Sequence, residues 1–555
     1  MKLRQGLKPL LWAMLGIACS STLHAELAQN ISVDIRALSL GNAVTADPPG
    51  ISAVHFNPAG LTHIQGLQTD LQNLLVDFNI RREFQAPPGF NVFGYSDDPV
   101  VCSDPADDGE KICRNFKDYG VSKVASPSLY VPVLKRFVNW PRGLPLAAPL
   151  AGVAYKPPGS KFTYATAAYA PLVAGFNQDD DDPGNFMGQQ VAMERITYLA
   201  PSAAYQISDN LSVGASFGMS YMGIGLSTDL RFPNELIGVL RLMDEDICAP
   251  FKENGSLVTD LLLFGICNAK EGVGPFKKFG RLEVALEQSL SPTYNLGILW
   301  EPNNDFAFGM VYQSNANMKL KGRYKVINAA GGPALIDALN SSVTGQILVA
   351  LLGFPSYMPP EESGLVSLNL EYPAHFQAGI KYKIVPDVQL NMDVGWTDFT
   401  AWGSFPFKFD REVSALRIAK LLTNGATSTS LDFPLRFRSP WNFGFGMEYS
   451  MTDRLKFRLG YEPRKSAIPD YRRNPMVPIN NAQMFGTGIG YRFDQDTEID
   501  LTAMHLRSKD SIPANTSSLA NQTGVNNLLL NPYAGLDIKT STKITILGIA
   551  YRTRW

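Results

Sequence analysis

The sequence predicts an all-β fold, a 14-stranded antiparallel transmembrane β-barrel, from the period of its apolar residues and the lengths of its connections. Before a short turn at residues 451–454, Trp441 and Phe443 alternate with Asn442 and Gly444, so one face of the strand is apolar and the other polar. Short turns on one side and long loops on the other are typical of membrane barrels. Further short polar turns stand at residues 208–210, 303–305, 386–387 and 494–496.

Alternating segments along the chain give fourteen strands, an even number as in single-chain bacterial barrels. The second strand is the least well defined, because residues 126–134 are an alternative to it or an extension of it. The expected strands cover residues 66–83, 150–157, 162–175, 189–207, 211–232, 279–301, 306–326, 364–385, 388–409, 433–450, 455–468, 482–493, 498–511 and 540–555.

The last predicted strand ends on Trp555, and Tyr551 and Ile549 share its face. This pattern resembles the carboxyl-terminal signal that the outer-membrane assembly machinery reads, although Phe is the usual last residue. The assembly machinery is therefore an expected partner, as are the lipopolysaccharide and phospholipid of a Gram-negative outer membrane.

Charge and hydropathy exclude several classes of protein. The chain has 555 residues and a formal net charge of -2, and its basic residues are spread through the strands, so we expect no nucleic-acid binding. No later segment has the roughly 18 consecutive apolar residues of a transmembrane helix. A membrane role must then use strands, and a mean hydropathy of -0.05 agrees with alternate residues facing lipid.

The amino terminus has the features of a secretory signal peptide. Basic residues precede an apolar stretch at residues 10–18, and small residues lead to a cleavage site after Ala25. We therefore expect residues 1–25 to be removed. Lipidation of Cys19 is the weaker alternative, because Gly16 stands where such sites usually carry Leu.

The four cysteines of the mature chain form two local pairs inside long connections. In an oxidising compartment we expect the disulfides Cys102–Cys113 and Cys248–Cys267. A metal site is the weaker alternative because no histidine lies near either pair. We expect no metal and no cofactor.

The expected organisation is a signal peptide at 1–25, a plug at 26–65 and a barrel at 66–555. Residues 26–65 show little alternation and cannot form a strand pair. Because a barrel of this size would otherwise be an open channel, we expect them to fold inside the lumen as a hatch. A disordered periplasmic tail is the alternative.

Two short motifs lie in this plug. Residues 40–47 read Leu-Gly-Asn-Ala-Val-Thr-Ala-Asp, and residues 56–61 read Phe-Asn-Pro-Ala-Gly-Leu. With the signal peptide, the strand count and the last strand, they make the chain similar to the FadL family of outer-membrane transporters for long-chain fatty acids and other hydrophobic compounds. The resemblance covers nearly all of the mature chain and implies a barrel with an amino-terminal hatch, whose signature is Asn57, Pro58 and Ala59. A purely structural turn is the alternative for this triplet.

Two long connections, residues 233–278 and 329–362, are unusually apolar, at spacings that suit short amphipathic helices. Either they form the core of a cap, or part of their surface is a groove that captures a lipid-like molecule. In the resembled family the third and fourth extracellular loops form such a binding site, and these are the third and fourth here. The candidate groove residues are Leu236, Leu240, Leu261, Leu262, Phe264, Leu348, Leu351, Leu352 and Phe354.

The resemblance also implies that ligand leaves sideways, through a gap where the third strand kinks inward. The expected third strand contains Pro171 and Gly175. Proline removes a ladder hydrogen bond and glycine permits a bulge, so these residues are the candidate lateral opening. The alternative is that Pro171 marks the outer end of the strand.

Cations on two late strands are candidates for binding the head group of an anionic ligand. Arg436 and Arg438 alternate with apolar residues, as do Lys456 and Arg458, so all four are expected to face the lumen. Solvation of the lumen and binding of the plug are the commoner roles for such charges.

Two other polar features are poor candidates for a site. The acidic run at residues 179–182 is best interpreted as a solvated loop, with cation binding the weaker alternative. His505 and Ser508 are three apart on a strand and face opposite sides, which is wrong for a nucleophile and its base. We expect no catalysis.

The sequence therefore predicts a passive outer-membrane channel, a monomer, that takes up long-chain fatty acids or similar hydrophobic ligands by loop capture, hatch movement and lateral release. Uptake of hydrocarbons or aromatics and export of lipid by the same fold are alternatives, as is a surface barrel for adhesion or partner binding. A continuous apolar path from the loops to a gap in the wall would favour transport over adhesion.

Overall fold

A computed structural model describes most of the chain after residue 32. The described residues are 33–90, 120–124, 126–131, 136–139, 146–180, 182–230, 278–329, 331–421, 423–477, 480–523 and 530–555.

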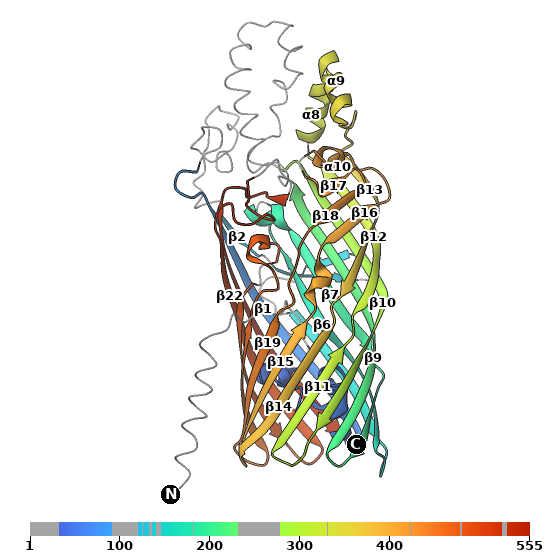
Figure 1. Cartoon of the computed structure of the whole chain (residues 1–555), viewed down its shortest axis with the longest axis vertical. Helices are drawn as coiled ribbons and strands as arrows, with labels where there is room; N and C mark the ends of the chain where they lie inside the picture. The colour runs from blue at the N-terminus through green and yellow to red at the C-terminus, as the bar shows by residue number, and fades with distance from the viewer. Residues whose placement is uncertain are drawn as a thin grey trace.

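The strands form a closed antiparallel barrel of fourteen passes (Figure 1). Closure is made where the first strand pairs with the last along its whole length, from Gln68 opposite Arg554 to Gln85 opposite Asp537. In chain order the passes are β1 (Gly66–Gln85), β5 (Leu146–Lys156), β6 (Phe162–Asn177), β7 (Gln190–Leu199) with β8 (Ser202–Ser208), β9 (Leu211–Leu230), β10 (Gly280–Trp300), β11 (Phe306–Gln313) with β12 (Ala316–Asn328), β13 (Glu361–Tyr372) with β14 (His375–Val385), β15 (Val388–Thr397) with β16 (Phe405–Phe409), β18 (Ser430–Phe433) with β19 (Trp441–Ser450), β20 (Leu455–Arg464), β21 (Ala482–Arg492), β22 (Thr497–Ile512) and β23 (Asp537–Arg554).

The expected and observed strands differ at the second, ninth and tenth passes. In the ninth, expected to run over residues 388–409, residues 398–404 are not a strand and include the 3-10 turn η7 (Phe399–Trp402). The second pass is β5, and the alternative region forms a separate strand, β3 (Ser126–Val131), which pairs with the end of β6. The tenth was expected to run continuously from residue 433, but residues 434–440 are not a strand. Arg436 lies there with φ 52°, a left-handed conformation that interrupts an extended chain.

Apolar and polar side chains alternate along the strands, with the apolar ones on the outer face of the wall, as the sequence predicts. In β19, Trp441 and Phe445 are exposed on the outer face, whereas Asn442 and Glu448 are buried on the inner face. The last strand follows the same rule, and Tyr551 is among its exposed aromatic residues. An outer surface of this kind suits a hydrocarbon solvent.

The two ends of the barrel differ. Short turns such as residues 386–387 and 451–454 join strands at one end, where Trp555 also lies, its amide nitrogen donating to the Leu67 carbonyl at 2.8 Å (Figure 1). The opposite, long-loop end carries helices α8 (Gly331–Asn340), α9 (Val343–Leu352) and α10 (Ser414–Ala419) (Figure 1).

No helix in the described part of the chain is both long and apolar enough to cross a membrane.

Residues 33–65, called the N-terminal segment below, pack inside the barrel. Their side chains are almost all buried, and their hydrogen-bond partners lie on strands around the wall, including Gln72 on β1, Asp393 on β15 and Thr502 on β22. The segment contains α2 (Ile35–Ser39), the 3-10 turn η1 (Gly50–Ser52), α3 (Ala53–Phe56) and the 3-10 turn η2 (Pro58–His63).

Glycines on the inner face of the wall let the backbone of the N-terminal segment come unusually close. A Cβ atom on Gly460 would lie 2.1 Å from the amide nitrogen of Gly41, and one on Gly486 would lie 2.0 Å from the carbonyl oxygen of Leu38. Both contacts are with backbone, which cannot rotate away. These positions therefore require glycine for a packing reason.

We predict that Gly460→Ala displaces the N-terminal segment. Overpacking of this kind lowers the free energy of unfolding by about 1–3 kcal/mol. Urea unfolding should measure the loss, and planar-bilayer recordings should show a higher conductance. Gly403→Ala is the matched control, since its Cβ would have Thr400 as its neighbour at 3.6 Å. Equal stability of both variants would contradict the close approach.

Candidate functional site

An apolar cavity of ≈ 310 Å³ lies inside the barrel, nearer the long-loop end than the N-terminal segment. Along β1, Gln72 touches the segment, and the same face farther on carries Phe78 and Ile80, which line the cavity. Leu226 of β9 and Phe407 of β16 line other sides. The volume falls at the lower end of the roughly 300–1,000 Å³ usual for small-molecule sites.

The wall is irregular beside this cavity, at the third pass. Pairing between β5 and β6 runs from Tyr155 opposite Tyr164 to Ala151 opposite Ala168, and the described residues show no β5–β6 pairing beyond it. Pairing between β6 and β7 shifts register between Tyr169 and Leu172. We call this interval, with Pro171 inside it, the wall break. Proline has no N–H to donate, so it fits a position where the ladder stops.

The wall break lies between the cavity and the N-terminal segment. Leu172 lines the cavity. Three residues earlier, the ring of Tyr169 packs edge-on against His55 of α3, with centroids 5.0 Å apart, and His55 in turn contacts Phe56 at 5.2 Å. A movement of α3 would therefore change the packing at the break.

Gly175, the second residue predicted for a lateral opening, has another local role. It lies in the regularly paired part of β6, opposite Ala192, and it lines the cavity. A Cβ atom there would lie 2.0 Å from the carbonyl oxygen of Ser128 on β3. Glycine at this position is explained by the close approach of β3, not by a bulge.

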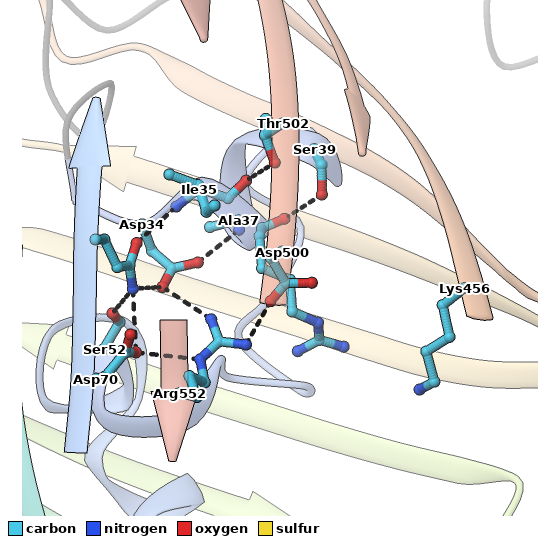
Figure 2. A network of polar contacts seen from close by, with 12 residues as sticks. Asp34, Ile35, Ala37, Ser39, Ser52, Asp70, Lys456, Asp500, Thr502 and Arg552 are labelled. Atoms are coloured by element: carbon cyan, nitrogen blue, oxygen red, sulfur yellow. Dashed lines mark hydrogen bonds and ion pairs between the residues drawn. The ribbon is translucent and has the colours of Figure 1, made fainter. Parts of the chain in front are cut away.

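A buried charge network, drawn in Figure 2, fastens the N-terminal segment to the barrel seam. Arg552 of β23 donates to Asp70 on β1 at 3.1 Å and to Asp500 on β22 at 2.5 Å. Its guanidinium also lies 3.7 Å from Asp34, which caps α2 by accepting the Ala37 N–H at 2.9 Å. One arginine thus joins three strands and the segment.

A second part of the network includes two of the predicted lumen cations. Arg458 is buried and pairs with Asp500 and, at 2.7 Å, with Glu448. Lys456 reaches the other oxygen of Glu448 at 2.7 Å. Arg36 of the N-terminal segment lies 3.4 Å from the same carboxylate. Arg458 and Lys456 thus pair with carboxylates of the wall, one of which also lies beside the N-terminal segment, and binding of a ligand by these cations stays a prediction.

The other two predicted lumen cations point away from the cavity. Arg436 and Arg438 are exposed. Leu435, before Arg436, and Phe437, between the two arginines, are buried and line the cavity. The expectation that both arginines face the lumen was wrong. It assumed that the alternation of β19, in which Asn442 faces inward, continues back to residue 433. Phe433, Leu435 and Phe437 all line the cavity, so the set of inward-facing residues changes between Phe437 and Asn442.

The Asn57-Pro58-Ala59 triplet fixes the shape of the N-terminal segment. The Asn57 amide donates to the carbonyls of Thr45 at 2.8 Å and Ile298 at 3.0 Å, and its oxygen accepts the Ala59 N–H at 3.1 Å. Pro58 is the first residue of η2, where proline is well tolerated. These contacts support the structural alternative for the motif.

The apolar loop residues are only partly within the described chain. Leu236, Leu240, Leu261, Leu262 and Phe264 lie outside the described residues, as do both expected disulfides, Cys102–Cys113 and Cys248–Cys267.

In the second loop, one side of α9 packs and the other is open. Leu348, Leu352 and Phe354 are partly buried, and Phe354 packs against the main apolar core. Leu351 is 80% exposed, and Val343 and Ile347 precede it at four-residue intervals on the same face, also exposed. This loop therefore packs on one side of α9 and presents an apolar helix face on the other, and capture of a ligand by that face stays a prediction.

Two members of the acidic run at residues 179–182, Asp180 and Asp182, make side-chain contacts within the protein. Asp180 pairs with Arg281 at 3.0 Å, and Asp182 accepts the N–H groups of Gly184 and Lys123. The hydrogen bond from Arg281 is the largest cause of a lowered pKa at Asp180. The described residues contain no cluster of acids, histidines or cysteines that could hold a metal.

His505 and Ser508 lie on opposite faces of β22. His505 is exposed and contacts Thr545 at 3.2 Å, whereas Ser508 is buried and donates to the Asn481 carbonyl at 2.8 Å. The separation argued from their spacing is confirmed.

The sequence analysis did not predict the cavity, although the residue pattern of β1 indicates it. On the inward face of β1, Asp70 and Gln72 are followed by Val76, Phe78 and Ile80. The face changes from polar to apolar halfway along a strand. This change lies at the height in the lumen where the N-terminal segment ends and the apolar cavity begins.

The closed barrel, its apolar outer belt and its lumen filled from the amino-terminal side define an outer-membrane β-barrel protein of Gram-negative bacteria. The chain belongs to the outer membrane protein transport protein family (OMPP1/FadL/TodX), whose family profile matches residues 17–555. The description of that family names transport and not catalysis.

Individual relatives are distant. The chain is 24% identical to the 47 kDa outer membrane protein of Pasteurella multocida over 42% of this chain and 49% of that one. It is 21% identical to the long-chain fatty acid transport protein of Salmonella typhi over 61% and 64% of the two chains. The chain thus spans less than two thirds of the length of these curated relatives.

Solved structures share the fold over nearly the whole chain. A FadL homologue from Pseudomonas aeruginosa has a TM-score of 0.64 at 16% identity, covering 95% of this chain and 99% of that one. The toluene transporter TbuX of Ralstonia pickettii has a TM-score of 0.55 at 14% identity, covering 96% and 99%.

We predict that Arg552→Met destabilises the barrel strongly. It leaves Asp70 and Asp500 buried without their shared cation, at a cost of about 3–5 kcal/mol. Urea unfolding in detergent micelles is the measurement. Arg554→Met, on the same strand but exposed, is the control. Equal stability of the two variants would contradict a fastening role for the network.

We also predict that Asp47 makes stability depend on pH. Burial tends to raise the pKa of Asp47, but Arg36 at 2.5 Å and Lys381 at 3.7 Å outweigh burial and lower that pKa. A lowered folded-state pKa means that Asp47 stabilises the fold above its unfolded pKa of about 4 and ceases to do so as the pH falls through the folded value.

Asp47→Asn should therefore destabilise the protein at neutral pH and reduce the loss of stability on acidification. Unfolding midpoints measured at neutral pH and in acid test this. Asp453→Asn, in an exposed turn, should keep the wild-type dependence. If the stability of Asp47→Asn depended on pH as that of the wild type does, the ionised Asp47 carboxylate would not be stabilised by Arg36 and Lys381.

Proposed function

We propose that this protein takes up hydrophobic molecules across the outer membrane, and that long-chain fatty acids are its main substrates. The observation that carries the proposal is the apolar cavity next to the wall break. A polar solute would gain nothing from such a cavity, whereas an acyl chain gains about 0.8 kcal/mol for each buried CH₂ group. The substrate named for the Salmonella typhi relative supports the choice of fatty acids.

The route begins at the long-loop end. The exposed face of α9, with Val343, Ile347 and Leu351, offers apolar contact at the outer surface. Ligand passes from there into the cavity, which places its chain beside Leu172 and the wall break. It then leaves sideways at Pro171 into the membrane plane, so the chain never enters water.

In this proposal the N-terminal segment acts as a hatch. It fills the lumen between the cavity and the short-turn end, so ligand cannot pass straight through the barrel. The contact between His55 and Tyr169 links it to the wall break. A small void of ≈ 10 Å³ lies between the segment and strands β1, β5 and β6. A shift of the segment there would extend the cavity to the break.

Aromatic hydrocarbons are the second candidate substrate. Several aromatic side chains line the cavity, among them Phe78, Phe407 and Trp402, and such rings pack well against aromatic ligands. The fold of the toluene transporter of Ralstonia pickettii supports the same alternative. Lipid export and adhesion have no comparable observation in their favour.

The first test is growth of a deletion strain on single carbon sources. Loss of growth on oleate, with unchanged growth on toluene and on alkanes, would support fatty acid uptake. Loss on toluene alone would support the aromatic alternative. Unchanged uptake of all three labelled compounds, in a strain without other members of this family, would contradict the proposed function.

A second test fills the cavity. Leu226→Trp places a larger side chain in it, and uptake of labelled oleate should fall at least tenfold because the chain loses its binding space. Leu547→Trp makes the same substitution on the exposed outer wall and should leave uptake unchanged. Equal uptake by both variants, at equal amounts of folded protein in the membrane, would rule out the cavity as the route.

A further inference from the structure

A patch of exposed cations lies on the outer face of the wall, at the seam where the first and last strands pair. It spans β22, β23, β1 and the short strand β2 (Val121–Lys123), toward the long-loop end of the barrel. Its side chains face outward, because residues between them such as Leu506, Ser508 and Thr542 are buried. The seam patch, as we call it, consists of six exposed residues, Arg81, Lys123, Arg507, Lys509, Lys539 and Lys543.

Strand pairing brings these cations together. Arg507 lies directly opposite Lys543. Two residues nearer the long loops, Lys509 and Arg81 lie on either side of Ser541. Neighbouring strands are about 4.8 Å apart, and alternate residues of one strand are separated by about 6.8 Å. The long side chains of these four cations are therefore within reach of one phosphate group.

Positive charge is in excess at the seam patch. The outward rows that hold its six cations hold three acids, Asp77, Glu83 and Asp537. The whole chain has 49 basic and 51 acidic residues, so the excess is local. Glu83 pairs with Arg81 at 2.9 Å. Within the described part of the chain, Lys539 and Lys543 form no ion pair.

A second basic strand of the outer wall, β12, is balanced by acids. Its outward residues Lys321 and Lys325 lie directly opposite Glu287 and Glu283 of β10. Lys325 also pairs with Glu361 at 2.8 Å. An unbalanced cluster of cations is therefore not a general property of this wall.

The guanidinium of Arg507 is held in place by its neighbours. Its Nε and Nη2 donate to Gln483 Oε1 at 3.1 and 2.7 Å, and it lies 5.6 Å from the centroid of the Phe485 ring. Among the described residues Nη1 has no partner, so its N–H groups remain for an anion. A side chain that is already oriented loses little conformational entropy when it binds.

The seam patch adjoins the apolar belt on its long-loop side. On β23, Leu547 is exposed and Lys543 lies four residues nearer the loops. On β22, Leu501 is exposed and Arg507 follows it on the same face. The long loops of such barrels face the outside of the cell, so the patch lies where the head groups of the outer leaflet begin. That leaflet is lipopolysaccharide, whose lipid A carries phosphate groups next to its acyl chains.

We propose that the seam patch binds one lipopolysaccharide molecule, with lipid A phosphates on Arg507, Lys543 and their neighbours and acyl chains on the apolar belt. Charge-assisted hydrogen bonds from guanidinium and ammonium groups are strong and suit phosphate. The site is separate from the cavity and does not depend on the transported substrate. Because the bound molecule contacts β22, β23 and β1 together, it stabilises the closed seam by mass action.

The test uses the full-length protein in phosphatidylcholine nanodiscs, with and without a lipopolysaccharide that lacks its outer polysaccharide. Native mass spectrometry should show one molecule retained by the wild type, and the same lipid should raise the unfolding temperature. Arg507→Gln with Lys543→Gln should weaken retention at least tenfold and abolish the rise in unfolding temperature. Arg507→Lys with Lys543→Arg keeps both charges and should keep most of the retention.

The matched control is Lys321→Gln with Arg323→Gln, which removes two exposed cations from β12 and leaves the seam intact. It should retain lipopolysaccharide as the wild type does. In phosphatidylcholine alone, all variants should unfold at the wild-type temperature, because every substituted side chain is exposed. The single variant Lys543→Gln leaves the contacts of Arg507 untouched and should show a smaller loss in the same direction.

Several outcomes would overturn the proposal. Equal retention by the wild type and the Arg507 and Lys543 double variant is the first. An equal loss in the β12 control is the second, since it would indicate only general attraction between a basic wall and an anionic lipid. Retention of lipid A without phosphates as tightly as the intact molecule would show that acyl contacts alone hold it. Displacement by an equal concentration of phosphatidylglycerol would show that any anionic lipid fits.

Discussion

The contacts of Arg552 are the interaction on which the rest of the structure depends. A barrel closes only where its first and last strands meet, and here that seam carries a buried cation that pairs with Asp70 on β1 and Asp500 on β22. The same cation reaches Asp34 at the start of α2. Removal of any partner would leave an uncompensated charge in the lumen. Wall closure and the position of the N-terminal segment are therefore set by one group of charges.

The lumen is divided by height into a polar and an apolar half, and this division explains how one barrel holds both the N-terminal segment and a cavity. The short-turn half offers carboxylates, amides and glycines that bind the backbone and polar groups of the N-terminal segment. The long-loop half offers Phe78, Leu226 and Phe407. The wall break at Pro171 lies at the height where the two halves meet. A ligand chain and a polar segment thus occupy separate volumes of the same barrel.

The strands were predictable because the alternation of apolar and polar residues, and the residue types of short turns, are local properties of the sequence. Trp441 and Phe443, on either side of Asn442, show this alternation. The irregularity at Pro171 was also predictable, since proline cannot complete a ladder. The facing of Arg436 and Arg438 was not, because residues 434–440 leave the strand conformation and the set of inward-facing residues changes between Phe437 and Asn442.

The position of Arg552 on the last strand has a consequence for the order of assembly. Until β23 is in place, the wall is open and the cation that holds Asp34 is missing. A nascent barrel without β23 therefore lacks one of the contacts that hold its N-terminal segment, although those to β1, β15 and β22 do not need that strand. Trp555, which bonds to Leu67 where the segment joins β1, lies at the same corner. Closure of the wall and completion of the Arg552 network thus depend on the same strand.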